Sequence, residues 1–151
     1  MTNIEKINFL LNQVEDKLHH TKVNNDSPNN LRKNNLNRVA LLYAELELEK
    51  KHPDFSTIFN YKAMNLAGIG LKNEDFGEIR EGKYVQIIAI AYEIDTNAKR
   101  IIKNSSLGYY GKAEKLTQKD KSNIIEFVLR WRYEKTFQHS DHYQQLLQKF
   151  N

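Results

Sequence analysis

Apolar residues recur at steps of three and four in the first part of the chain, which is the period of an amphipathic helix. The first stripe consists of Ile4, Ile7, Leu11, Val14 and Leu18. It predicts a helix over about 2–20. A second stripe over roughly 31–51 predicts another helix, which ends before Pro53 because proline disfavours a helical residue ahead of it.

Between these two helices lies an asparagine-rich segment, VNNDSPNNLRKNN, at residues 23–35. Asn, Asp and Ser favour turns because their side chains bond to nearby backbone, and proline fixes its own φ. We therefore expect a mobile loop at 23–35. A third apolar stripe over 55–66 predicts a helix that Gly68 and Gly70 terminate.

The segment YVQIIAIAYEIDTNAKRIIKN, residues 84–104, permits two interpretations. Its apolar residues fall on one helical face over more than five turns, which favours a long central helix. The same run is rich in isoleucine, and Asp95-Thr96-Asn97 is a plausible hairpin turn. We expect the helix, with a hairpin as the alternative.

The C-terminal third predicts a helix over about 118–138, capped by Thr117, and a short final helix over 141–150. Residues 139–142 would form the break between them. About five amphipathic helices favour an all-α, single-domain bundle over residues 1–151, because each apolar stripe needs a cover. The alternative fold class is α+β, with a hairpin at 84–104.

Charge and composition narrow the function classes only modestly. The net charge of +4 and the pI near 9.1 permit a polyanionic partner without requiring one. The chain has no cysteine, which excludes disulfides, thiolate zinc sites and cysteine nucleophiles. It carries no glycine-rich phosphate loop, nucleophile elbow or paired-histidine zinc motif, so an ordinary metabolic enzyme is disfavoured.

One pair of residues carries candidate catalytic chemistry. Arg132 and His139 lie seven residues apart, so on one helix they would share a face about 10 Å apart along the axis. An arginine can stabilise a developing phosphorane charge, and a histidine can transfer protons near neutral pH. Arg132 facing solvent and His139 at a helix end is the alternative.

The arginine, six intervening residues and the histidine resemble the motif of HEPN-type ribonucleases. Lys135 lies between the pair and Ser140-Asp141 follows it, whereas Tyr133 stands where that family usually has a small polar residue. The resemblance covers about ten residues. It implies a small all-α bundle, usually dimeric, that cleaves RNA without metal at the dimer interface.

Metal and cofactor binding are not expected. His139, Asp141 and His142 lie within four residues, but no cysteine and no obvious fourth ligand accompanies them. A polar hinge between two helices accounts for the same residues. We therefore predict no metal and no cofactor.

Nucleic-acid binding is a second hypothesis, because cations meet phosphates and exposed tyrosines can stack on unpaired bases. Residues of these two types cluster in the C-terminal half of the chain. The candidates are Tyr109, Tyr110, Lys112, Lys115, Arg130, Arg132 and Lys135.

The leading hypothesis is a non-catalytic regulatory or protective protein that binds a protein partner, of the immunity, antitoxin or inhibitor type. Such proteins act by shape and charge complementarity and need no motif. A nucleic-acid-binding protein of a mobile element and the HEPN-like ribonuclease are the alternatives. The N-terminus resembles neither a secretory signal nor a spanning helix, so we expect a cytoplasmic protein without a membrane partner, and a homodimer is compatible.

Overall fold

The computed structural model describes residues 2–19 and 27–151. Its longer elements are α1 (Asn3–His19), α2 (Ser27–Glu45), β1 (Ala63–Ala67), β2 (Tyr84–Ile94), β3 (Arg100–Lys112) and α3 (Gln118–Leu147). Four 3-10 turns accompany them: η1 (Leu48–Lys50), η2 (Phe55–Asn60), η3 (Ala113–Lys115) and η4 (Gln148–Phe150). The fold is therefore α+β.

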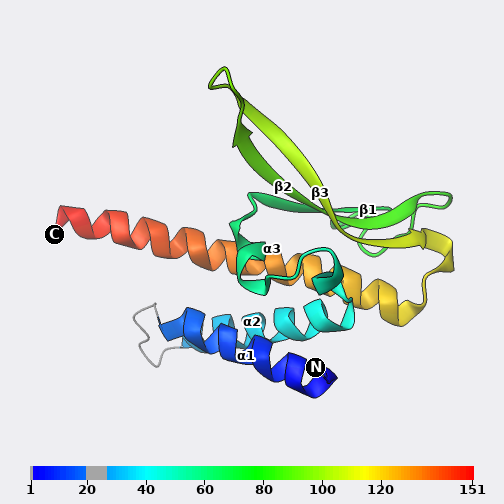
Figure 1. Cartoon of the computed structure of the whole chain (residues 1–151), viewed down its shortest axis with the longest axis horizontal. Coiled ribbons are helices and arrows are strands. Elements are labelled where there is room, and N and C mark those ends of the chain that lie inside the picture. The colour runs from blue at the N-terminus through cyan, green and yellow to red at the C-terminus, as the bar shows by residue number, and fades with distance from the viewer. Residues whose placement is uncertain (1, 20–26) are drawn as a thin grey trace.

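The elements form three layers (Figure 1). α1 and α2 run antiparallel as one layer, the long helix α3 forms the middle layer, and an antiparallel sheet of order β1-β2-β3 forms the third. Two parts project from this body: the far end of the β2–β3 hairpin and the C-terminal end of α3. Among the described residues, α1, α2 and α3 lie on the same side of the sheet.

The all-α prediction is wrong, because residues 84–104 form the hairpin that was the alternative. Direct partners include Tyr92 with Ile102 and Ile94 with Arg100. The Asp95 carboxylate accepts hydrogen bonds from the backbone N–H groups of Asn97 and Lys99 and so stabilises the turn. β2 has apolar residues on both faces, so its sequence fits the apolar stripe of a helix as well as it fits a strand.

Two other predicted elements are also corrected. Residues 55–60 form a 3-10 turn and residues 63–67 the edge strand β1, in place of a helix over 55–66. Gly68 follows β1 at a φ of 89°, and a Cβ there would lie 2.8 Å from the Tyr84 carbonyl oxygen. This glycine ends a strand. Only glycine adopts a positive φ of this size with so little room between it and the neighbouring strand β2.

The helical boundaries differ from the predictions in the middle and at the end of the chain. The helix over 2–20 corresponds to α1, and α2 begins at Ser27, so residues 27–35 are helical and not a loop. Residues 23–26 lie outside the described residues. The predicted break at 139–142 is absent, because α3 is continuous. Residues 118–147 contain neither glycine nor proline, so nothing in the backbone interrupts it.

The core lies where α3 meets both neighbouring layers. Trp131 of α3 is buried, and its indole N–H donates to the Ile58 carbonyl oxygen at 2.8 Å. Facing α2, the Arg32 guanidinium donates two hydrogen bonds to the buried Glu134 carboxylate, at 2.8 and 3.0 Å. Arg38 pairs with Glu126 in the same bidentate way at 2.8 and 3.0 Å. These contacts fix the middle of α3 against α2.

Candidate macromolecule-binding surface

The sheet has one covered and one uncovered face. Alternate residues of a strand point to opposite faces, and Val85, Ile87 and Ala89 of β2 are fully buried on the α3 side. Residues 84, 86, 88, 90, 92 and 94 therefore point away from α3. Since the described helices all lie on the other side, none of them packs on this face.

Five large side chains on the uncovered face are exposed. We call this set the outer face: Tyr84, Tyr92, Ile94, Ile102 and Tyr109. Ile94 is 76% exposed and Ile102 is 67% exposed, although isoleucine is among the residues most often buried in folded proteins. Ile88 and Ile90 lie between the two ends and are half-buried. The outer face therefore forms an apolar strip along the hairpin.

Contacts between side chains order both ends of this strip. The Tyr84 and Tyr109 rings lie 5.8 Å apart between centroids near one end of the hairpin. Near the other end, the Arg100 guanidinium lies over the Tyr92 ring at 4.0 Å from its centroid, which is a cation–π contact. These rings are therefore positioned before any partner binds.

The far end of the hairpin, residues 91–103, is a projecting arm (Figure 1). Its two faces differ in chemistry. On the face opposite to the outer face, Lys103 and Glu93 form an ion pair at 3.3 Å. On the outer face, Tyr92 and Ile102 lie side by side as direct partners in the ladder. The opposite face also has Ile101, which lies directly across from Glu93 and is 42% exposed, so the outer face is the more apolar of two faces that the body leaves uncovered.

The predicted nucleic-acid-binding residues of β3 and η3 divide between two faces. Tyr109 lies on the outer face, and Lys112 and Lys115 are exposed at the end of the sheet. Tyr110 points the other way and is half-buried, with its hydroxyl donating to the Leu46 carbonyl oxygen at 3.5 Å. Burial raises the pKa of the Tyr110 hydroxyl. Tyr110 is therefore a packing residue.

The three basic candidates on α3 diverge. Arg130 turns toward α2 and donates to Glu126 at 2.6 Å and Asn35 at 3.2 Å. Arg132 turns toward β1, and the Lys135 ammonium donates to the Phe59 carbonyl oxygen at 2.7 Å. The seven predicted residues therefore do not form one surface.

Arg132 and His139 share a face of the continuous helix α3, as their spacing predicted. The Arg132 guanidinium donates two hydrogen bonds to the Met64 carbonyl oxygen, from Nε at 3.1 Å and from Nη2 at 2.9 Å. It therefore covers a backbone acceptor on the edge strand β1, and burial lowers its pKa. His139 is exposed.

The sheet departs from the all-α bundle that the ribonuclease resemblance implies. Catalysis by Arg132 and His139 stays a prediction. RNA cleavage that disappears in both the Arg132→Ala and the His139→Ala protein would support it.

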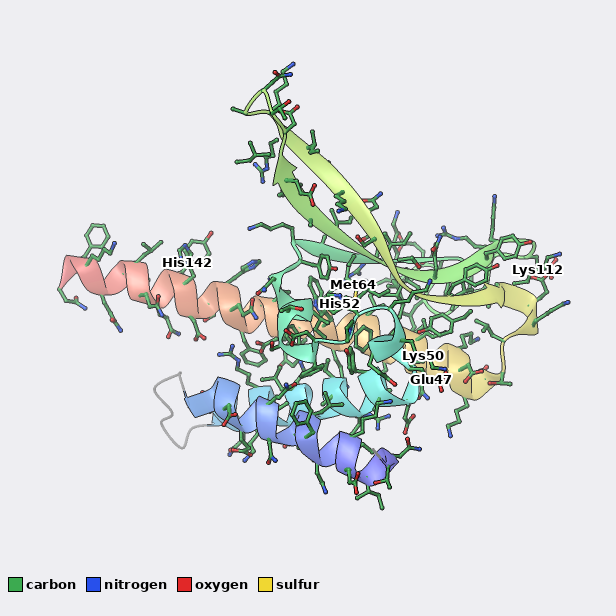
Figure 2. The ribbon with its side chains drawn as sticks, viewed as in Figure 1. Glu47, Lys50, His52, Met64, Lys112 and His142 are labelled. Carbon is green, nitrogen blue, oxygen red and sulfur yellow. The ribbon has the colours of Figure 1, made fainter. Side chains whose placement is uncertain are left out.

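One of the metal candidates, Asp141, pairs with a cation. Asp141 accepts a hydrogen bond from the Arg32 guanidinium at 2.6 Å. Across residues 2–19 and 27–151, no group of three or more His, Asp or Glu side chains could hold a metal ion. Figure 2 shows Lys112 and His142 at opposite ends of the molecule, so the basic candidates near Lys112 and the histidines of α3 form separate regions.

One further histidine lies in a polar cluster near η2. His52 Nε2 lies 2.8 Å from Thr57 Oγ1, and Thr57 in turn donates to the Asp54 carbonyl oxygen at 2.9 Å. Because a hydroxyl has one proton, Thr57 accepts from His52 Nε2, and the Tyr61 hydroxyl lies 3.4 Å from His52 Nδ1. The side chains of His52, Thr57 and Tyr61 each have a polar partner within the cluster, so the cluster stabilises η2.

Sequence reasoning missed the outer face. A signal for it was present in the sequence. Tyr92 and Ile94 alternate with polar residues, and in a hairpin that turns at residues 95–97, Ile102 lies directly across from Tyr92. A half-covered sheet normally has polar residues at such positions, so large apolar residues there indicate a binding surface.

The fold and the surface together define an α+β domain with a projecting hairpin arm. Comparisons of the chain with protein-family models, with curated proteins and with solved structures found no match. Across the described residues, no helix is both long and apolar enough to cross a membrane.

Proposed function

We propose that this chain is a non-catalytic protein that binds a protein partner through the outer face of its sheet, in the manner of an immunity protein, antitoxin or inhibitor. The observation that carries the proposal is the exposure of Ile94 and Ile102 beside Tyr92 on an arm that its own helices leave uncovered. Contiguous exposed apolar surface on a small protein marks a binding site.

The composition of the outer face supports a protein as the partner. Tyrosine and arginine are enriched among the residues that carry most of the binding energy at protein interfaces. The outer face has three tyrosines and two isoleucines, with Arg100 held on Tyr92. Aromatic rings that are already ordered lose little conformational entropy on binding. Most of the contact energy between these rings and a partner would therefore contribute to the binding free energy.

The charge of the arm argues against nucleic acid as the main partner. Residues 91–103 have three basic and two acidic residues. Lys103 is paired with Glu93, and the Asp95 carboxylate is used by the turn. A phosphate backbone requires several uncommitted cations along its track, and the arm offers few.

The test is loss of a partner complex on mutation of the arm. The complex is isolated by cross-linking from cells that produce the protein, and its stoichiometry is measured. We expect the double variant Ile94→Glu with Ile102→Glu to lose the complex while it keeps the fold. The matched control is Ile4→Glu with Phe9→Glu, at two exposed apolar positions of α1; this variant keeps the complex.

Two results would overturn the proposal. The first is a complex that both variants retain, because binding would then lie elsewhere. The second is binding of mixed RNA and DNA that weakens with salt and disappears when Lys99, Arg100 and Lys103 are changed to glutamine, because the arm would then bind phosphates.

A further inference from the structure

The C-terminal end of α3 extends beyond the body of the protein (Figure 1). We call residues 138–151 the tail. Its large apolar side chains are exposed: Tyr143 at 64%, Leu146 at 38%, Leu147 at 64% and Phe150 at 87%. They recur at steps of three, one and three, so they form one stripe along a helix. A helix with a stripe of this kind gains stability when another surface covers the stripe.

The tail stripe points to the same side of α3 as Arg132. Positions 132, 139, 143, 146 and 150 follow one another at steps of seven, four, three and four, which keeps them on one face. At Arg132 this face contacts β1 through the Met64 carbonyl oxygen. The face that the sheet covers in the body is therefore the face left uncovered in the tail.

The charge of the tail is neutral. Residues 138–151 contain one acidic residue, Asp141, one lysine, Lys149, and two histidines, which the formal charge counts as neutral. Asp141 already pairs with Arg32, and neither charge lies on the apolar stripe. Glutamines at 138, 144, 145 and 148 make up much of the remaining surface. Two copies of this surface can approach one another without repulsion between like charges.

From these observations we propose that the tail pairs with the tail of a second copy of this chain, as an antiparallel helix pair about a two-fold axis. An axis near Leu146 and Leu147 brings Tyr143 of one copy against Phe150 of the other, and the leucines against each other. A two-fold contact requires one surface that is complementary to itself, which the sequence of large residues supplies.

The antiparallel direction follows from the position of the sheet. Paired helices lie about 8–10 Å apart. In a parallel pair, both copies of β1 would project from the same end of the tails toward the opposing helix, and they would overlap. In an antiparallel pair, the two bodies lie at opposite ends of the tails.

The area of the stripe fits a weak dimer. From their exposed fractions, the four side chains present roughly 500 Å² per copy, so the pair would bury at most on the order of 1,000 Å², which is the lower limit for a specific interface. We therefore expect monomer and dimer in an equilibrium that depends on protein concentration.

Sedimentation equilibrium of the full chain tests this proposal. The average mass should rise with concentration toward twice the 17.8 kDa of one chain. Leu147→Glu should raise the dimer dissociation constant roughly tenfold or more, because the interface would bury an unpaired carboxylate. Leu31→Glu, at an exposed leucine of α2, is the matched control and should leave the equilibrium unchanged. Circular dichroism checks that each variant keeps its helical content.

The direction of the pair is tested with introduced cysteines, since the chain has none of its own. A mixture of Tyr143→Cys and Phe150→Cys proteins should form mixed disulfide dimers faster than either protein alone. A mass that stays monomeric at every concentration, a dimer that Leu147→Glu leaves intact, or faster linkage of Tyr143→Cys to itself would overturn the proposal. Ile94→Glu with Ile102→Glu should remain dimeric, which separates this result from partner binding by the arm.

Discussion

The two faces of β2 have similar side chains and different surroundings. Ile87, on the face toward α3, is fully buried, whereas Ile94, on the outer face, is 76% exposed. Burying an isoleucine stabilises a fold by about 1.5–3 kcal/mol, so only the first residue contributes fully to folding. An apolar residue that its own chain leaves exposed is available to a partner, and this difference separates the folding surface from the proposed binding surface.

The largest effect is expected at the contact between α2 and α3, where Arg32 has one covered and one exposed carboxylate partner. Glu134→Ala leaves the Arg32 guanidinium buried without its bidentate partner, which should cost about 3–5 kcal/mol of unfolding free energy. Asp141→Ala removes the more exposed partner and should cost about 1 kcal/mol or less. Urea unfolding of both variants measures the difference, and equal losses would contradict it.

Substitution on the two faces of β2 tests the comparison directly. Ile87→Ala should lower the free energy of unfolding by about 2–5 kcal/mol, because it creates a cavity in the core. Ile94→Ala should change it by about 0.5 kcal/mol or less, because the side chain is surrounded by solvent. Thermal and urea unfolding provide the values. A large loss at Ile94 would show that the arm packs on the body.

The edge of the sheet should respond to Arg132→Ala. The variant loses two charge-assisted hydrogen bonds to the Met64 carbonyl oxygen and should lose about 1.5–3 kcal/mol of stability. Arg132→Lys keeps the charge without the planar guanidinium and should recover part of this loss. Amide hydrogen exchange in β1 should quicken in both variants, and unchanged exchange would contradict the role of Arg132 at the edge.

A smaller, pH-dependent effect is expected at Glu126. Hydrogen bonds from Arg38 and Arg130 lower its pKa from the ordinary value of 4.5 to about 2. Because the folded pKa lies below the unfolded one, the stabilisation is present above pH 4.5 and is lost as the pH falls through about 2. Glu126→Gln should cost about 1 kcal/mol at neutral pH, after allowance for the partial exposure of the pair. The difference in stability between the two proteins should shrink as the pH falls and disappear below about pH 2 in urea unfolding, and a constant difference would exclude this origin.

The predictable part of the fold is the part where one face of a helix packs on the core. α1 and the first half of α3 follow this pattern, and Thr117 caps α3 by accepting from the Asp120 backbone N–H at 3.1 Å. Residues 84–104 were misread because large apolar residues occupy both faces of β2. Ile87, Ile88, Ala89 and Ile90 form a continuous apolar run, which hides the alternation that identifies a strand.

The candidate site was less predictable than the fold. Arg130, Arg132 and Lys135 are close in sequence, but a helix turns about 100° per residue, so their side chains meet different layers. The outer face depends instead on pairs such as Tyr92 with Ile102, which are distant in sequence and meet only through the register of the hairpin. The polar residues at 139–142 suggested a hinge, although the backbone continues as a helix.

The most direct test of the outer face is hydroxyl-radical footprinting of its tyrosines in the free protein and in the complex with the partner. We expect oxidation of Tyr84, Tyr92 and Tyr109 to fall in the complex, while that of Tyr133, an exposed tyrosine of α3, stays unchanged. A complex in which the three outer-face tyrosines are oxidised as fast as in the free protein would contradict the assignment of this face as the binding surface.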